Sequence, residues 1–366
     1  MSPRKAAPSP ARLGYRMPAE WEPHEATWIA WPHQGDDWPG RLGVVRWTFV
    51  EIVRQLARGE TVEILFPDRR QARHAMRRLE HSHVELDRVR AHLLPTDRSW
   101  MRDSGPTFVR RSGSAPADRA SVALIQWKFN AWAKYPDWHR DRRVPPWIGR
   151  HLGRPLYRAR WRGRWVTLEG GAIDVDGAGL LLATEACLLG GPNVRNPGLG
   201  RAATESALRA NLGIEEVVWL GEGIDGDDTQ GHIDDLARFV GPASVLVVSP
   251  YGEDDENRGV LEQNRDRLER FRTRHGRRLV VRELPSPRPV VYRGQRLPAS
   301  YANFYVANGS VLVPTFDDPH DGAAMDVLRG AFPDREVVGI RSRDLVWGLG
   351  TIHCLTQQQP AAVGGR

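Results

Sequence analysis

The sequence predicts an α/β fold, a five-bladed pseudo-symmetric α/β propeller of strand–strand–helix–strand units around a central channel. Three observations predict it. Hairpin signals recur with a period of about 65 residues, with turns at positions 176, 241 and 308. Each hairpin is followed by a helix-like segment and then by a lone strand. The rest of the chain divides into two further units, and one of them is split between the chain ends, which would close a ring without free sheet edges.

The three clearest hairpins consist of two apolar runs joined by a dipeptide that favours tight turns. Asp-Gly and Asn-Gly between apolar runs are strong hairpin signals, because such turns need positive φ angles. A generic α/β domain with accidental regularity is the alternative to the ring. The predicted hairpins are residues 171–183 with the turn Asp176-Gly177, residues 232–249 with Gly241-Pro242, and residues 301–314 with Asn308-Gly309.

Each of these hairpins precedes a stretch of helical character and a short strand-like run. In residues 256–275, for example, Val260, Leu261, Leu268 and Phe271 fall broadly on one side, as in an amphipathic helix. The predicted helices are residues 201–212, 256–275 and 323–332, and the strands that follow them are residues 216–220, 278–284 and 336–341.

Two further units are less regular. One has predicted strands at residues 106–109 and 122–127 and a helix within residues 137–152. In the split unit, residues 351–356 would pair near residues 27–31, and residues 44–57 and 62–66 would supply the helix and the last strand. Because a single unit of this size cannot bury its own apolar faces, the five units would share them in a ring.

The composition limits the domain organisation. The 366 residues, of which 40% are hydrophobic, are enough for one large core. Residues 1–16 are rich in Pro, Ala and basic side chains and lack the apolar segment of a signal peptide, so we expect a disordered tail there. A single catalytic domain is then expected over residues 17–360, with a C-terminal tail over residues 361–366. No apolar run is long enough to span a bilayer, so no membrane partner is expected.

Charge and cysteine content narrow the class of protein further. The net charge is +7, from 52 Lys and Arg against 45 Asp and Glu, which could indicate nucleic-acid binding. The basic residues are scattered through mixed-sign stretches, however, so we expect a solvated surface and no nucleic-acid partner. Cys187 and Cys354 are far apart, which excludes a disulfide framework or a four-cysteine zinc site and fits a reducing, cytoplasmic location.

Chemically reactive side chains recur at the entry of the predicted hairpins. Equivalent positions in a ring converge at one end of its channel, so these side chains would face a common cavity. Neighbouring glycines permit close approach of the backbone. The residues are Asp103 before Ser104-Gly105-Pro106, Glu169 before Gly170-Gly171, His232 and Asp234 in Gly231-His232-Ile233-Asp234, and Cys354 after His353.

Taken singly, each of these residues has an ordinary structural explanation. Asp103 could cap a turn, Glu169 could be a solvated strand end, and His232 could be a satisfied, half-buried histidine. Cys354 could be a small core residue, which is the commoner role of a lone cysteine. The functional interpretation therefore depends on the joint pattern.

A thiol among carboxylates suits a cationic substrate. Cysteine attacks as its thiolate, and neighbouring carboxylates disfavour that form unless the substrate brings positive charge. A small-molecule guanidinium is planar, permanently charged and bound by carboxylates through paired N–H bonds. Asp103 and Asp234 could hold it over Cys354, while His232 protonates the departing ammonia and then activates water. Glu169 could bind a nitrogen or hold the imidazole, and the covalent intermediate would be a thiouronium.

The same side chains could instead be metal ligands. His232, Asp234 and Cys354, together with His353, have zinc-competent side chains. No pair of histidines at helical spacing is present, and the other carboxylates would be left without a role. We therefore rank this alternative below the thiol mechanism and expect no metal.

At these residues the sequence resembles the agmatine deiminases, in the wider family that includes the bacterial peptidylarginine deiminases. The similarity runs from Met17 to Pro360, nearly the whole chain, and five ordered motifs of this length are highly specific. The motifs are MPAEWEPHE from Met17 with WIAWP from Trp28, WMRDSGP from Trp100, LEGG from Leu168, GHID from Gly231, and IHCLTQQQP from Ile352.

The resemblance implies the five-bladed propeller and the hydrolysis of agmatine to N-carbamoylputrescine and ammonia, without a cofactor. It implies Cys354 as the nucleophile, assisted by Glu169 and His232, with Asp103 and Asp234 binding the guanidinium and Trp100 as a further substrate contact. Deimination of free or peptidyl arginine and amidino transfer to an amine stay open as alternatives, as does a nucleic-acid-binding protein with a vestigial site. A homo-oligomer also stays open.

Two features depart from the family pattern. The family usually has a run of glycines before the nucleophile, whereas this sequence has Gly348-Leu349-Gly350-Thr351, so Leu349 could alter the loop or narrow the cavity. Residues 188–197 form a longer stretch than in the family, which affects contacts with the far end of the substrate more than the chemistry. Cys187 lies in an apolar run, and we expect it to have a structural role.

Overall fold

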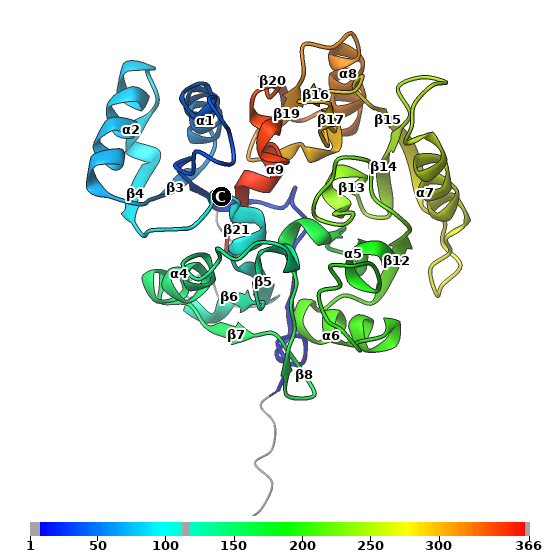
Figure 1. The fold of residues 1–366 in the computed structure, drawn as a ribbon. Helices are drawn as coiled ribbons and strands as arrows, with labels where there is room; N and C mark the ends of the chain where they lie inside the picture. Colours follow the sequence, from blue (N-terminus) through cyan, green and yellow to red (C-terminus); the bar gives the residue numbers. More distant parts are fainter. Residues whose placement is uncertain (1–7, 112–117, 363–366) are drawn as a thin grey trace, which may run out of the picture.

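The computed structural model describes residues 8–111 and 118–362 and has a mixed α/β fold. Five sheets of three or four strands follow one another along the chain, and in Figure 1 they lie around the middle of the view with helices toward the outside. Each sheet contains an antiparallel strand pair, which the strand after the helix joins in parallel, and the sheet with β5 and β6 has a second antiparallel pair through an added N-terminal strand. The α/β class predicted from the sequence is confirmed, whereas the closed propeller stays a prediction.

The three units with the clearest turn signals have three-stranded sheets, and each predicted turn lies between two antiparallel strands. The predicted helix over residues 256–275 is too long, because Phe271 adopts an extended backbone and ends the helix at Arg270. The elements are β10 (Asp174–Val175), β11 (Leu180–Thr184), α6 (Arg201–Leu212) and β12 (Glu216–Leu220); β13 (Ala237–Gly241), β14 (Ser244–Ser249), α7 (Arg258–Arg270) and β15 (Val280–Pro285); and β18 (Tyr305–Ala307), β19 (Ser310–Thr315), α8 (Asp321–Ala331) and β20 (Glu336–Arg341).

The other two units have four-stranded sheets, with two strands more than were predicted in the first and one more in the split unit. In the split unit, the C-terminal strand pairs antiparallel with β2, as the ring model requires. The elements are β1 (Tyr15–Arg16), β5 (Thr107–Arg111), β6 (Val122–Gln126), α4 (Val144–Leu152) and β7 (Leu156–Arg158); and β21 (Thr356–Pro360), β2 (His24–Ala30), α1 (Leu42–Ala57), β3 (Thr61–Phe66), α2 (Arg69–His81) and β4 (Val89–Leu93).

Two predictions about the chain ends are wrong. Residues 351–356 do not form the last strand: Ile352–Leu355 is a helical turn, α9, and the strand β21 begins at Thr356. Residues 8–16 are not a disordered tail, because Tyr15 is buried, pairs with Arg111 across β1 and β5, and donates a hydrogen bond to the Ala120 carbonyl at 2.6 Å. The rest of the predicted tails, residues 1–7 and 363–366, lies outside the described residues.

A short helical turn precedes the first strand of every unit. Each turn contacts the turn of the next unit, and the last contacts the first. Side chains on these turns are therefore brought together although they are far apart in sequence. The turns are α3 (Met101–Ser104), η6 (Gly170–Ala172), η7 (Ile233–Asp235), η8 (Tyr301–Asn303) and α9 (Ile352–Leu355).

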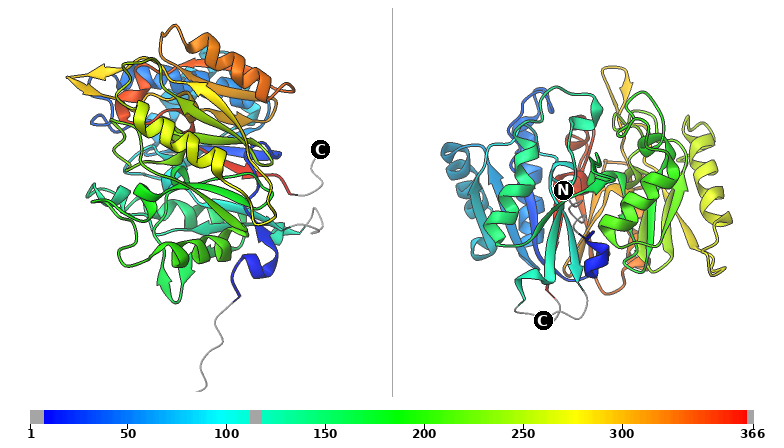
Figure 2. Two further views of the ribbon diagram at one scale, coloured as in Figure 1. Left: turned by 90° about the vertical axis from the view of Figure 1, so that its right-hand side faces the viewer. Right: turned by 90° about the horizontal axis from the view of Figure 1, so that it is seen from below.

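The remaining elements are connections. In Figure 2 the yellow ribbon β16–β17 projects from the body of the molecule, and its Tyr292 stacks on Trp347 with ring centroids 3.7 Å apart. These elements are β8 (Arg160–Trp161), β9 (Arg164–Trp165), β16 (Val291–Tyr292), β17 (Gln295–Arg296), α5 (Glu185–Leu188), η1 (Ala11–Leu13), η2 (Leu86–Arg88), η3 (Arg119–Ser121), η4 (Ala131–Ala133), η5 (Asp141–Arg143) and η9 (Leu345–Gly348).

The core lies between each sheet and its helix. On α1, for example, Val45, Phe49, Ile52, Val53 and Leu56 are buried in the cluster that also contains strand β3, so one face of the helix covers the sheet. Among the described residues, the helices lack a segment long and apolar enough to cross a bilayer.

Candidate active site

The ring of helical turns gathers all five reactive residues that the sequence singled out. Asp103 lies on α3, Glu169 directly precedes η6, His232 and Asp234 lie at η7, and Cys354 lies on α9. All five side chains are buried, with Cys354 the most exposed at 8%. Equivalent positions of the repeat therefore converge in space for these five residues, as predicted from the sequence.

Gly171 shows how tightly the side chains meet. A Cβ atom at this position would lie 2.6 Å from His232 Nδ1 and 3.0 Å from both Asp103 Oδ1 and Asp234 Oδ2. Any side chain there would displace the imidazole or a carboxylate. The Gly-Gly pair after Glu169 is thus required by the close packing of the reactive groups.

The Cys354 thiol lies against polar partners from two other units. Its sulfur is 3.1 Å from Asn303 Nδ2 and 3.6 Å from Asp234 Oδ2. Burial raises the pKa of Cys354 well above its ordinary value, and the charges of Asp234, Asp235 and Asp103 raise it further. The thiol is therefore protonated until positive charge enters the site, as the carboxylate-rich sequence pattern predicts.

The sequence analysis did not identify Asn303, although it lies on η8, the helical turn of the one unit that supplies none of the five predicted residues. Its Oδ1 accepts hydrogen bonds from Thr351 Oγ1 at 2.8 Å and from the backbone N–H of His353 at 3.1 Å. Its Nδ2 donates to Asp235 Oδ1 at 3.0 Å as well as to the sulfur. Asn303 thus fixes the turn that carries the thiol. Its place at the entry of the third predicted hairpin is the sequence signal that could have identified it.

The carboxylate of Asp103 is oriented by two hydrogen bonds, one to each of its oxygens. Oδ1 accepts from the Gly171 N–H at 2.9 Å, and Oδ2 accepts from Trp132 Nε1 at 2.8 Å. Burial raises the pKa of Asp103, the charge of His232 opposes this, and Asp234 and Glu169 raise it again. A cation placed beside Asp103 would be stabilised by an already oriented carboxylate.

His232 lies between two carboxylates, with Nδ1 3.8 Å from Asp103 Oδ2 and Nε2 3.5 Å from Glu169 Oε2. Burial alone would lower the pKa of His232, but Asp103, Cys187 and Glu169 together raise it well above its ordinary value. These neighbours favour the imidazolium form of His232, which can donate a proton. Its Nε2 has no hydrogen-bond partner within the described part of the chain.

Glu169 is paired with Arg195, which the sequence reasoning missed. Arg195 Nε lies 3.0 and 2.9 Å from the two carboxylate oxygens, and Arg195 Nη2 donates to the Thr229 carbonyl at 2.7 Å. Burial alone would raise the pKa of Glu169, but Arg195 and then His232 lower it. Arg195 belongs to the long 188–197 stretch, so this loop acts on the site through Glu169. Nothing in the local sequence around Arg195 indicates this pairing.

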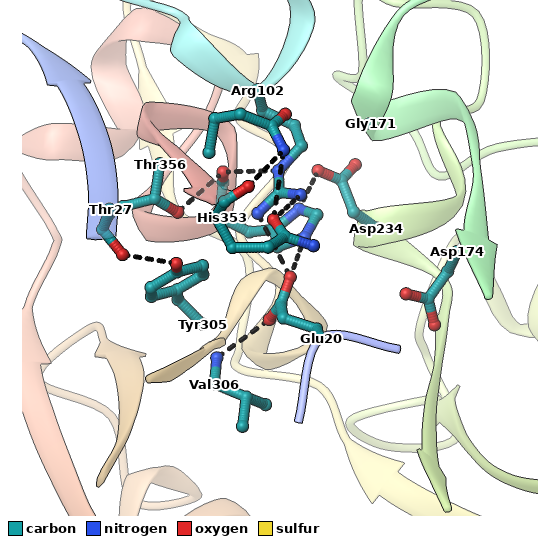
Figure 3. A network of polar contacts seen from close by, with 12 residues as sticks. Glu20, Thr27, Arg102, Gly171, Asp174, Asp234, Tyr305, Val306, His353 and Thr356 are labelled. Carbon is teal, nitrogen blue, oxygen red and sulfur yellow. Dashed lines mark hydrogen bonds and ion pairs between the residues drawn. The ribbon is translucent and has the colours of Figure 1, made fainter. Parts of the chain in front are cut away.

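Asp234 is oriented by a buried chain of charged groups, which Figure 3 shows. His353 Nδ1 lies 2.7 Å from Asp234 Oδ2, and His353 Nε2 lies 2.9 Å from Glu20 Oε2. Glu20 also accepts from Arg102 at 3.1 Å and from Arg238 at 2.9 Å. Burial would raise the pKa of Glu20, but Arg238, His353 and Arg102 hold it well below its ordinary value. A charged network therefore supports the carboxylate beside the thiol.

A narrow pocket of about 30 Å³ reaches Cys354. Trp100 lines it together with Asp103 and Trp132, and the role of Trp100 as a substrate contact stays a prediction. Leu349 also lines the pocket and has a left-handed backbone with φ 66°, where a family glycine would be unstrained. The expectation that Leu349 restricts the cavity agrees with this position.

The structure brings together a different set of potential metal ligands from the set that the sequence suggested. Within the described ranges, the potential ligand group is Glu169, Cys187 and His232, whose donor atoms lie within 4.8 Å of one another. The ligand set suggested by the sequence was His232, Asp234, Cys354 and His353 instead. Cys187 is fully buried in the apolar core, as expected, but its thiol also lies close to the imidazole of His232.

An α/β fold that gathers a thiol, an imidazole and several carboxylates in one buried pocket has the features of the deiminase class of enzymes. The chain belongs to the Porphyromonas-type peptidyl-arginine deiminase family, whose family model matches residues 16–360.

Similar proteins support this membership over nearly the whole chain. An agmatine deiminase of Pseudomonas aeruginosa is 37% identical over 376 aligned positions, which cover 96% of this chain and 97% of the relative. The solved agmatine deiminase of Enterococcus faecalis is 30% identical, with a TM-score of 0.88 and coverage of 99% and 100% of the two chains. The solved putative arginine deiminase of Porphyromonas gingivalis is 35% identical, with a TM-score of 0.83 and coverage of 95% and 99%.

Proposed function

We propose that the protein hydrolyses agmatine to N-carbamoylputrescine and ammonia. The observation that carries this proposal is the buried Cys354 thiol beside Asp234 and near Asp103, because burial and these carboxylates raise the pKa of the thiol until a cation neutralises them. Family membership and the relatives named agmatine deiminases support the choice of guanidinium and of agmatine.

In the first half of the proposed reaction, Asp103 and Asp234 accept N–H bonds from the guanidinium and hold its plane over the sulfur. The positive charge lowers the pKa of Cys354, the thiol loses its proton to water, and the resulting thiolate attacks the central carbon. His232, as the imidazolium, donates a proton to one NH₂ group. The C–N bond then breaks, ammonia leaves, and the alkylthiouronium stays on Cys354.

In the second half, water attacks the same carbon and the neutral His232 accepts its proton. The C–S bond breaks, the second proton of the water passes to the sulfur, the neutral carbamoyl product leaves with the water oxygen, and Cys354 is regenerated as the thiol. Glu169, fixed by Arg195, keeps the imidazole in place and favours its charged form. Trp100 forms a wall of the pocket. Every step is supplied by side chains and water, so the proposed reaction needs no cofactor.

The substrate assay compares agmatine, free arginine and a peptidyl-arginine by ammonia release from the full chain. Agmatine should be turned over with the highest kcat/KM. Turnover of arginine alone or of peptidyl-arginine alone would identify that compound, and not agmatine, as the substrate. A product that forms only with an amine acceptor would indicate amidino transfer. No release from any of the three by folded protein would reject the enzymatic proposal.

The two cysteines provide a matched pair of variants. Cys354→Ala should abolish ammonia release, whereas Cys187→Ala should still form the covalent intermediate, because its thiol is not the one beside Asp234. A trapped adduct on the Cys187 peptide would overturn this assignment.

We also infer that the five units close into a five-bladed propeller over residues 17–360, with β1 as an addition from the N-terminal segment. Support comes from the order of contacts among the turns, in which α3 contacts α9 at one junction and η6 at the other. We further propose a cytoplasmic location, which suits two free thiols.

A further inference from the structure

A cavity of about 430 Å³ lies between helices α1 and α2, away from the candidate active site. It shares no lining residue with the pocket at Cys354. Arg46 from α1 and Arg70, His74 and Arg78 from α2 line it together with His33. No aspartate or glutamate is among the lining residues. A hollow of this size is large enough for a small organic ligand.

Within residues 8–111 and 118–362, Arg46 and Arg78 have no carboxylate partner. The acceptors for Arg46 there are neutral, namely the Pro32 carbonyl at 3.1 Å and Gln71 Oε1 at 3.2 Å. Arg78 stacks over Trp47 at 5.2 Å, and its buried Nη1 has no hydrogen-bond partner among the described residues. Burial lowers the pKa of Arg46, and the charge of Arg78 lowers it further. Two like charges are thus held close together, which an anion would relieve.

His33 lines the same cavity with an imidazole that is held by two backbone carbonyls. Its Nδ1 lies 2.8 Å from the Trp31 carbonyl and its Nε2 lies 3.0 Å from the Thr96 carbonyl. Arg70 contributes less positive charge to the cavity than Arg46 and Arg78, because the exposed Asp68 that caps α2 lies near the charge of Arg70.

We propose that this cavity binds a small anion that carries two or more phosphate groups. Arginine guanidinium groups bind phosphate oxygens through paired N–H bonds, and Arg46 and Arg78 are already oriented by neutral partners. The cavity volume exceeds the need of a single phosphate, and its place between two helices favours a small molecule over a nucleic-acid duplex. Inorganic pyrophosphate and a nucleoside triphosphate share this chemistry.

The test is calorimetric titration of the full chain with inorganic pyrophosphate and, separately, with ATP. Wild-type protein should bind at least one of them saturably with one site per chain, more tightly at low than at physiological salt. Arg78→Gln should weaken binding by about tenfold or more. Arg73→Gln is the matched control, because Arg73 is exposed on the same helix and does not line the cavity; it should change the affinity by less than about twofold.

The outcomes separate the proposal from its alternatives. Pyrophosphate binding without ATP binding would identify an inorganic ligand, and tighter ATP binding would identify a nucleotide. Equal weakening by both variants would mean diffuse surface attraction and would overturn the proposal. Equally tight binding of citrate, binding of duplex DNA alone, or no saturable binding would also overturn it. Arg46→Gln replaces Arg78→Gln if the latter unfolds, and unchanged deiminase activity of the variants checks folding independently.

Discussion

Replacing Arg195 by Met should destabilise the protein strongly, although Arg195 does not itself contact the thiol. Arg195 and Glu169 have fully buried side chains, and the variant leaves Glu169 without its nearest positive charge. Breaking a buried ion pair by removing one partner typically costs about 3–5 kcal/mol. The unfolding entropy of a chain of 366 residues is about 0.8 kcal/mol per degree, so Tm should fall by about 4–6 °C.

Two further variants test this reasoning by differential scanning calorimetry. Arg201→Met removes an arginine from an exposed pair with Glu185, whose side chains are 48% and 33% exposed, and should cost less than about 1 kcal/mol. Arg195→Met combined with Glu169→Gln removes both buried charges and should regain most of the lost stability. The reasoning is refuted if Arg195→Met is no worse than Arg201→Met, or if the double variant is less stable than Arg195→Met alone.

Three other predictions concern binding, backbone strain and pH. Asp103→Asn and Asp234→Asn should stay folded but lose about a hundredfold or more in kcat/KM, about 2.7 kcal/mol; near-normal ammonia release would remove both from the site. Leu349→Val should destabilise the protein by about 1–2 kcal/mol more than Leu349→Gly in urea unfolding, because a β-branched residue fits φ 66° poorly, and equal stabilities would contradict this strain. Burial raises the pKa of Asp141 to about 7, above its value of about 3.9 in the unfolded chain, so stability should decline as pH rises from about 4 to above 7. Urea unfolding at pH 5 and at pH 8 should show that Asp141→Asn reduces this loss of stability by up to about 2.7 kcal/mol, and an unchanged slope would contradict the assignment.

The repeat in the sequence predicted most of the fold because its signals are local. The turns at Asp176-Gly177 and Asn308-Gly309 depend on backbone preferences of the residues themselves, and both lie between antiparallel strands. Residues 351–356 were misassigned because a single helical turn leaves no periodic pattern, and the polar strand β21 does not look like a strand in isolation. Tyr15 was assigned to a tail because its burial depends on a distant sheet.

The candidate site was predictable to the extent that its residues occupy equivalent places in the repeat. Cys354 and His232 follow this rule, and Asn303 follows it too but carries a neutral amide, which attracted no attention. Arg195 and Glu20 act through tertiary contacts of a loop and of the N-terminal segment. No spacing in the sequence encodes those contacts, so they become visible only in the folded chain.

The most direct test of the central claim is a mass measurement of the covalent intermediate. Full-length protein is mixed with agmatine, quenched in acid within the first turnover, digested and analysed by mass spectrometry. The proposed mechanism predicts an added mass equal to agmatine minus ammonia on the peptide that contains Cys354. The adduct should be absent from Cys354→Ala. Ammonia release without any adduct on Cys354, or with the adduct on Cys187, would contradict the assignment of Cys354 as the nucleophile.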